Sequence, residues 1–108
     1  MELAAVIENF VVLKPGIPVT MHFSDHRVVS RAITDPVRLV PVTRETLLFY
    51  VDEIGGTKVD KMYSILSQKH AAEFAGYLPG KKYVGYRFTV VKDAPGFVPP
   101  RIVSVKPL

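Results

Sequence analysis

The clearest structural signal in the chain is LLFYVDEIGGTKVDKMYSIL, which occupies residues 47–66. Two runs rich in aliphatic and aromatic residues flank Gly55 and Gly56. Glycine readily adopts the positive φ angles that tight hairpin turns require, whereas most other residues resist them. The stretch therefore predicts an antiparallel hairpin that turns at the two glycines.

A short helix is expected directly after this hairpin, over SQKHAAEFAGYL at residues 67–78. Ser67 can accept a hydrogen bond from a free backbone N–H of the first turn, as residues before a helix commonly do. Phe74 and Leu78 are four positions apart and therefore share one helical face, which we expect to pack on the sheet. Pro79-Gly80 then ends the helix.

The chain before the hairpin has a looser β pattern, in which Met21 and Phe23 fall on one face. The polar residues Ser24 and Asp25 interrupt that alternation. This predicts either a long first strand bent at those two residues or two strands joined by a tight turn. Residues 36–45 contain two prolines and are expected to form an extended loop or an edge.

After the helix, KYVGYRFTVVK (82–92) and RIVSVK (101–106) predict two further strands. In the first of them an apolar face alternates with a face that carries Arg87. The loop between the two strands displays Phe97. The predicted fold class is all-β or α+β, a small five-stranded OB-like β-barrel with one helix between the third and fourth strands.

Length and composition bound the class of protein. With 108 residues the chain is expected to be one domain, 1–108, in which residues 1–12 form a helix or a strand. It has no cysteine and no apolar run near the roughly 20 residues that cross a membrane as a helix. Because the N-terminus lacks a basic leader, we expect a cytoplasmic protein with no membrane partner. The formal net charge of +4 favours a polyanionic partner, although solubility alone also explains such an excess.

Three stretches carry a resemblance to a known family: TDPVRLVPVTRETLLFYVDEIGG (34–56), VDKMYSILSQKHAAEFAGYL (59–78) and YRFTVVKDAPGF (86–97). In element order and texture they resemble the OB-fold single-stranded-DNA-binding proteins of phage and archaeal type. The resemblance implies sequence-tolerant binding of single-stranded DNA, or of RNA, across the second and third strands. Carried onto this chain, it implies nucleic-acid-binding residues at Arg38, Arg44, Tyr50, Lys61, Tyr63, Arg87, Lys92 and Phe97.

Such a site combines cations that neutralise phosphates with aromatic faces on which bases stack. The five cations in this set should share one surface, because a groove that follows the nucleic-acid backbone needs contiguous positive potential. The chain has no tryptophan, which lowers the affinity that we expect. The ordinary alternatives are half-buried strand tyrosines for Tyr50 and Tyr63, and solvated charges for Lys61 and Arg87. Which side of the hairpin faces inward stays open, because both sides carry apolar residues.

Motifs for catalysis or metal binding are weak. His22 and His26 share a face of a straight strand but are roughly 13 Å apart along it, so only a sharp bend between them could let both hold one metal ion. No G-x-S-x-G, H-E-x-x-H or P-loop pattern occurs. We therefore expect a protein that is not an enzyme and uses no cofactor or metal. The competing hypothesis is a protein-interaction or assembly module that docks a partner, or a second copy of itself, through an edge strand.

Overall fold

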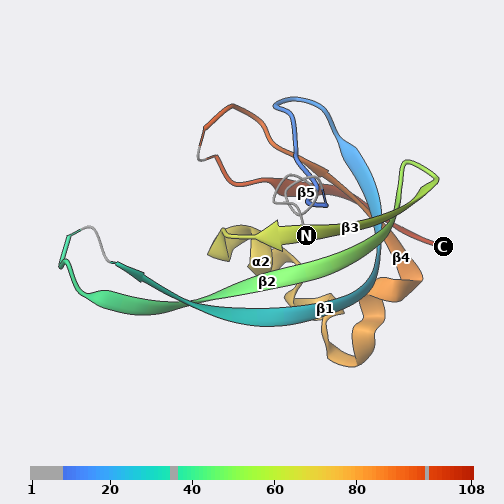
Figure 1. Cartoon of the computed structure of the whole chain (residues 1–108). Helices are drawn as coiled ribbons and strands as arrows, with labels where there is room; N and C mark the ends of the chain where they lie inside the picture. The colour runs from blue at the N-terminus through green and yellow to red at the C-terminus, as the bar shows by residue number, and fades with distance from the viewer. Residues whose placement is uncertain (1–8, 35–36, 97) are drawn as a thin grey trace.

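One antiparallel sheet of five strands makes up the body of the protein (Figure 1). The computed structural model describes residues 9–34, 37–96 and 98–108. The strands are β1 (Val19–Thr34), β2 (Pro41–Ile54), β3 (Thr57–Ile65), β4 (Tyr86–Val91) and β5 (Arg101–Pro107). The expected five strands, with a helix between the third and the fourth, are confirmed. The order in the sheet is β3-β2-β1-β4-β5, so β3 and β5 are its edges and the described strands form an open sheet instead of a closed barrel.

The hairpin predicted at residues 47–66 is confirmed, because β2 and β3 pair along it in antiparallel register. Gly55 and Gly56 occupy the turn with φ angles of 58° and 84°. These angles lie in the left-handed region that glycine enters without strain. The side of β3 that carries Tyr63 and Ile65 faces the core, and this settles which side of the hairpin is inward.

β1 is one long strand with an irregular region, the first of the two forms expected from its sequence. Its register against β2 shifts between His22 and Asp25, where the chain accommodates an extra residue. The loop expected at residues 36–45 is shorter than predicted, because β2 already begins at Pro41, opposite Thr34. Proline is tolerated as the first residue of a strand, where the ladder of hydrogen bonds has not yet begun.

Beyond the sheet, β1 and β2 continue as a two-stranded ribbon made of residues 29–34 and 41–46 (Figure 1). These residues pair only with each other, because β4 pairs with β1 at residues 19–21 and β3 pairs with β2 from residue 47 onward. Figure 1 shows the ribbon reaching away from the helical segments and from β4 and β5. An isolated two-stranded hairpin is marginally stable in water, so the ribbon depends on its attachment to the sheet.

Residues 68–85 form three short helical segments on one side of the sheet, namely α2 (Gln68–Glu73), η1 (Ala75–Tyr77) and η2 (Pro79–Gly85). The expected cap is confirmed, because the Oγ atom of Ser67 accepts a hydrogen bond from the backbone N–H of His70 at 3.2 Å. The α-helix is shorter than predicted and ends at Glu73. The chain then tightens into 3₁₀ turns, which are common at the ends of α-helices.

The strand expected from residue 82 is also shorter, since β4 begins only at Tyr86. Residues 79–85 are helical, and Gly80 and Lys81 adopt positive φ angles of 65° and 53° inside that segment. This local geometry buries Tyr83 and leaves Val84 exposed, which reverses the alternation that a strand would have given.

Aromatic side chains dominate the core between the sheet and the helical segments. Phe23 of β1 and Phe49 of β2 stack with 4.1 Å between their ring centroids. Phe74 packs edge-on against Phe23, and all three rings are fully buried. Leu78 packs against the same cluster, so the predicted contact of the helical region through Phe74 and Leu78 is confirmed. Burying one such ring contributes roughly 1.5–3 kcal/mol to folding.

The first described residues run beside the edge strand β3. The backbone N–H of Met62 donates to the carbonyl of Asn9 at 2.7 Å, and Val11 N–H donates to the carbonyl of Met62 at 2.8 Å. Phe10 and Met62 form an isolated parallel bridge. The expectation of a helix or strand over residues 1–12 lies mostly outside the described residues. Among the described helices, none is long and apolar enough to cross a membrane.

Candidate functional site

Of the eight residues predicted to bind nucleic acid, the seven that the structure describes do not gather on one surface. Arg44 is on the ribbon, on the face opposite to that of the core residues Leu47, Phe49 and Val51 of β2. Lys61 is opposite Val51 in the sheet and therefore lies on the core side. The expectation that the five predicted cations share one surface is therefore wrong. Arg38 lies in the turn between β1 and β2, and Arg44 lies on the ribbon. Tyr50 is on the outer face of the sheet, whereas Lys61 and Tyr63 are on the inner face. Arg87 is on β4 and Lys92 follows it, while Phe97 lies outside the described residues.

A different set of cations does share a face, which we call the arginine face. In the β1–β2 register, Arg27 is opposite Leu48 and Arg31 is opposite Arg44. Successive strand positions alternate between the two faces, so positions 27, 31, 44 and 50 lie on the same face. Over residues 27–33 and 42–50 this face has three arginines and no carboxylate, while Glu45 belongs to the opposite face.

Positions 31 and 44 are opposite each other in the backbone register, so both belong to this face of the ribbon. Arg38 and Arg44 are both exposed, and Arg27 is exposed where the ribbon joins the sheet. The arginine face thus runs along a ribbon that, among the described strands, has no third strand paired to it at residues 29–34 and 41–46. Thr46 and Leu48, at the sheet end of this face, are buried.

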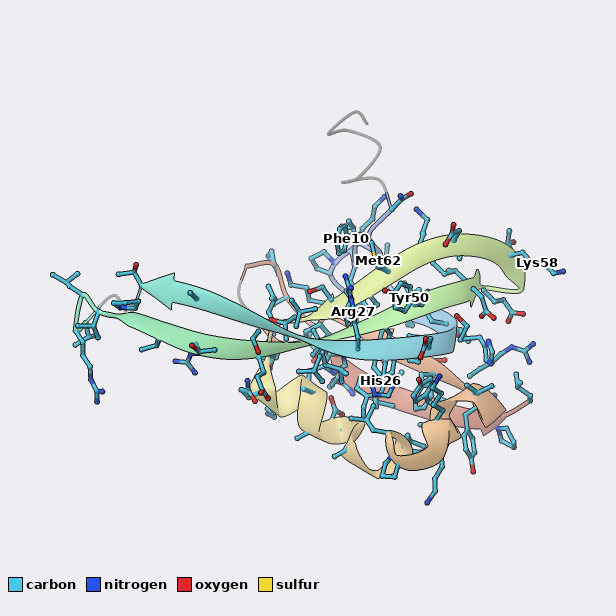
Figure 2. The ribbon with its side chains drawn as sticks, turned by 60° about the horizontal axis from the view of Figure 1, so that its bottom comes forward. Phe10, His26, Arg27, Tyr50, Lys58 and Met62 are labelled. Atoms are coloured by element: carbon cyan, nitrogen blue, oxygen red, sulfur yellow. The ribbon has the colours of Figure 1, made fainter. Side chains whose placement is uncertain are left out.

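Aromatic residues lie at the sheet end of this track. Figure 2 shows Arg27, Tyr50, Met62 and Phe10 on one side of the β1–β3 strands, with His26 on the other side. Tyr50 is opposite Met62 in the sheet, and Met62 bridges to Phe10, so the three are neighbours. Tyr50 and Phe10 are each partly exposed. They provide aromatic surface next to the cation Arg27, the combination to which unstacked bases bind.

Tyr63 does not belong to this outer surface. It is 3% exposed, and its ring lies parallel to that of Phe23 with 6.4 Å between centroids. Burial raises the pKa of its hydroxyl far above the usual range for tyrosine. The alternative expectation for Tyr63 was a half-buried strand tyrosine, but the side chain is fully buried as part of the core. Lys61 lies on the same side of β3 and is partly buried.

Arg87 lies on β4 and is already paired. Its Nε donates to Glu53 Oε1 at 2.6 Å, and its Nη2 donates to Glu53 Oε2 at 3.3 Å. These hydrogen bonds raise the pKa of Arg87 and lower the pKa of Glu53. A phosphate could reach Arg87 only in exchange for this carboxylate, although exposed ion pairs of this kind are individually weak.

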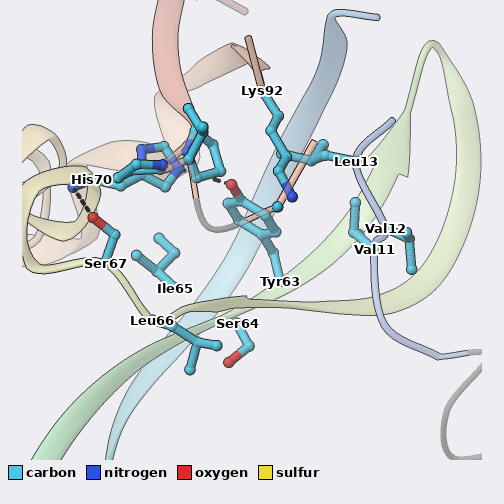
Figure 3. Close-up of a pocket in the computed structure, with 14 residues that line it drawn as sticks. Val11, Val12, Leu13, Tyr63, Ser64, Ile65, Leu66, Ser67, His70 and Lys92 are labelled. Carbon is cyan, nitrogen blue, oxygen red and sulfur yellow. Dashed lines mark hydrogen bonds between the residues drawn. The ribbon is translucent and has the colours of Figure 1, made fainter. Parts of the chain in front are cut away.

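Lys92 and Tyr63 meet at a pocket of about 600 Å³ between the two edges of the sheet, which we call the seam pocket (Figure 3). Its walls come from the N-terminal segment, the end of β3, the start of the helical region and the β4–β5 connection. The described lining residues are Val11, Val12, Leu13, Tyr63, Ser64, Ile65, Leu66, Ser67, His70, Lys92, Gly96, Val98, Pro99 and Pro100.

A chain of hydrogen bonds crosses the back of the seam pocket and joins β3, α2 and β5. His70 is 1% exposed, and its Nε2 lies 2.8 Å from the hydroxyl of Tyr63. Its Nδ1 lies 2.8 Å from Glu73 Oε1, and Glu73 Oε2 accepts from the backbone N–H of Ile102 at 3.1 Å. Burial lowers the pKa of His70 although the Glu73 carboxylate opposes this. A neutral ring that donates to Glu73 from Nδ1 and accepts from Tyr63 at Nε2 satisfies every contact.

The two histidines of β1 have separate partners. His22 contacts Asp52 through Nδ1 at 2.6 Å and the carbonyl of Val84 through Nε2 at 2.7 Å. His26 Nδ1 lies 2.6 Å from the hydroxyl of Tyr83. Among the described residues, no group of three or more His, Cys, Asp and Glu is placed to hold a metal ion.

Sequence reasoning missed Arg27, Phe10 and His70. Arg27 could have been found from its spacing to Arg31, because residues four apart on a strand share a face. His70 and Glu73 are three residues apart in the predicted helix, and such a pair signals a side-chain contact. Nothing in the sequence pointed to Phe10, whose position depends on the bridge to β3.

Comparisons with known proteins add no relative. No family model matches this sequence, and neither a curated protein nor a solved structure matches it significantly.

Proposed function

We propose that this protein binds single-stranded nucleic acid, DNA in preference to RNA, with little sequence selectivity and without catalysis. The binding surface is the arginine face of the ribbon together with the aromatic surface of Phe10 and Tyr50. The observation that carries this proposal is the segregation of charge on this face, which has arginine at positions 27, 31 and 44 and no carboxylate over residues 27–33 and 42–50. The nearest carboxylate in the register is Asp25, opposite Tyr50, and it pairs with Lys81. The supporting observation is that this face leads to Tyr50 and Phe10 at the sheet.

The chemistry of this surface suits a flexible polyanion. Arginines spaced along an extended ribbon can neutralise successive phosphates, and each exposed ring can stack a base for about 1–3 kcal/mol. Contacts to phosphates and to the faces of bases carry no sequence information, so selectivity among bases is expected to be low. The open β-sheet with its helical segment between β3 and β4 also agrees in strand order with an OB-like barrel whose β3 and β5 edges have not paired.

Fluorescence anisotropy tests the proposal directly. A labelled oligo-dT of about 20 nucleotides exceeds the roughly 4–16 nucleotides that one OB domain covers. Titrations at about 50 mM and about 200 mM salt should give an affinity that falls steeply with salt, because each phosphate contact releases counterions. An oligo-rU of equal length should bind more weakly. The absence of measurable affinity for oligo-dT at low salt would reject the proposal.

The second candidate function is a protein-interaction module, and one observation favours it. The turn of the ribbon carries Val37 and Leu39, which are 88% and 77% exposed. Exposed apolar side chains at the end of a projecting element are typical of a docking site. An interface centred on such residues would depend weakly on salt, so the same titration series separates the two functions.

A further inference from the structure

We propose that the seam pocket binds a small amphipathic anion, such as a medium-chain carboxylate, with its tail among the apolar walls and its charge beside Lys92. None of the residues Arg27, Arg44, Tyr50 and Phe10 lines the pocket, so its lining does not include the residues of the proposed nucleic-acid surface. This ligand site therefore does not depend on nucleic-acid binding.

The size and lining of the pocket suit such a ligand. Its volume of about 600 Å³ lies within the roughly 300–1,000 Å³ of small-molecule sites. Leu13, Ile65 and Val98 contribute aliphatic walls from three different segments, and Pro99-Pro100 adds a rigid one. Burying a hydrocarbon tail against these walls removes apolar surface from water on both partners.

The charge in the pocket selects an anion. Lys92 is its one charged residue among the described lining residues, and no carboxylate lines it. Figure 3 shows the Lys92 side chain descending toward the Tyr63 ring beside Leu13. The carbonyl of Lys92 accepts a hydrogen bond from the Gly16 N–H at 2.7 Å, which anchors the backbone from which this side chain extends.

Serine hydroxyl groups in the lining can donate hydrogen bonds to a bound anion. The Oγ atom of Ser67 accepts from His70 N–H, so its own O–H remains available to donate to an anion. The His70 ring is fully used by Tyr63 and Glu73 and stays out of ligand chemistry. Among the described lining residues, the donors that remain available are those of Lys92, Ser67 and Ser64, whose buried Oγ atom has no hydrogen-bond partner.

A nucleobase is a poorer occupant of this pocket. Tyr63 is only 3% exposed, so its ring offers almost no surface on which a base could stack. The remaining walls are aliphatic and offer few groups that could pair with base edges. An extended peptide would need an exposed strand edge in the pocket, but at Met62 the edge of β3 is already paired with residues 9 and 11.

Isothermal titration calorimetry with decanoate tests the proposal on the full chain at neutral pH. We expect one site per protein and a dissociation constant of roughly tens of micromolar, as the size of the ligand allows. Decanol and decyltrimethylammonium have the same tail, but they lack the negative charge, so each should bind about tenfold or more weakly. Equal binding of all three, several sites per chain, or no decanoate binding at about 1 mM would overturn the proposal.

Two variants assign the binding to the pocket. Lys92→Met keeps the length of the side chain and removes its charge, so decanoate should bind about tenfold more weakly while decanol is unchanged. Lys106→Met removes an exposed lysine of β5 that does not line the pocket and should leave both affinities unchanged. Equal losses in both variants would reject the assignment. Displacement of decanoate by oligo-dT would also reject it, because the pocket would then belong to the nucleic-acid site.

Discussion

The Nδ1 atom of His22 lies 2.6 Å from Oδ1 of Asp52, and this contact ties β1 to the neighbouring strand β2. The other ring nitrogen of His22 contacts the carbonyl of Val84, which can only accept a hydrogen bond. Both nitrogens must therefore donate, and an imidazole that donates twice carries a proton on each nitrogen. Burial alone lowers the pKa of His22, but the hydrogen bonds to Val84 and Asp52 outweigh it, so the pKa of His22 is raised.

This arrangement predicts a loss of stability in mildly alkaline solution. In the unfolded chain a histidine releases its proton near pH 6.5, whereas folded His22 retains it to higher pH. The stabilisation is therefore complete below about pH 6.5 and is lost as pH rises through the folded pKa. Urea unfolding at about pH 6 and about pH 8 should show this loss, and His22→Gln should reduce it.

The matched control for this prediction is His26→Gln. His26 contacts the hydroxyl of Tyr83, which can donate or accept, so this contact does not require both ring nitrogens of His26 to donate. We expect His22→Gln to cost about 1 kcal/mol at about pH 6 and less at about pH 8. If the two variants changed the pH dependence equally, the charged state of His22 would not be its cause.

The hydrogen bond between Tyr63 and His70 predicts a second effect on stability. Tyr63→Phe keeps the ring against Phe23 but leaves the buried Nε2 of His70 without a partner. An unsatisfied buried acceptor costs about 1–3 kcal/mol in the free energy of unfolding. Tyr50→Phe is the control, because Tyr50 is partly exposed and its hydroxyl hydrogen-bonds to no group among the described residues. Chemical denaturation that gave equal midpoints for both variants would contradict the buried network.

Hydrogen exchange should distinguish the ribbon from the rest of the sheet. Amides of residues 29–34 and 41–46 are held by one partner strand, whereas β2 from residue 47 onward has a neighbour on both sides. Elements with few buried contacts open at low free energy, so the ribbon should exchange faster than residues 47–51. Oligo-dT should slow exchange in the ribbon if that element binds it. Unchanged exchange at saturating oligo-dT would place the binding site elsewhere.

The parts of the fold that could be predicted from the sequence are those with local causes. The turn at Gly55-Gly56 needs positive φ angles, and the cap at Ser67 needs a side-chain acceptor, so a few residues suffice to indicate each. Contacts between distant parts of the chain have no such signature. Thr20 and Thr89 share a hydrogen bond of 2.8 Å across 69 positions, and this pairing of β1 with β4 decides which strands become edges.

The predicted site was less accurate because it depends on register. A shift of one residue moves a side chain to the opposite face of a strand. The irregular register near Ser24 sets which β1 positions face outward, and the early start of β2 at Pro41 places Arg31 opposite Arg44. Neither could be deduced from alternation alone, so Tyr63 was grouped with Tyr50 although the two lie on opposite faces.

The last prediction separates the stacking and electrostatic parts of nucleic-acid binding. Tyr50→Ala removes an aromatic face and should weaken oligo-dT binding by about 1–3 kcal/mol with little change in the salt dependence. Arg44→Gln removes one charge from the arginine face, so the slope of log affinity against log salt should flatten by about 0.7 for one phosphate contact on a single strand.

Arg101→Gln is the matched control for Arg44→Gln. Arg101 is an exposed arginine on β5 that pairs with Asp93, and it is not part of the arginine face. Its loss changes the net charge of the protein by the same amount, so any effect of overall charge appears in both variants. Anisotropy titrations at several salt concentrations should therefore show a flatter slope for Arg44→Gln alone. Identical slopes for the two variants would mean that net charge, and not the ribbon, attracts the polyanion.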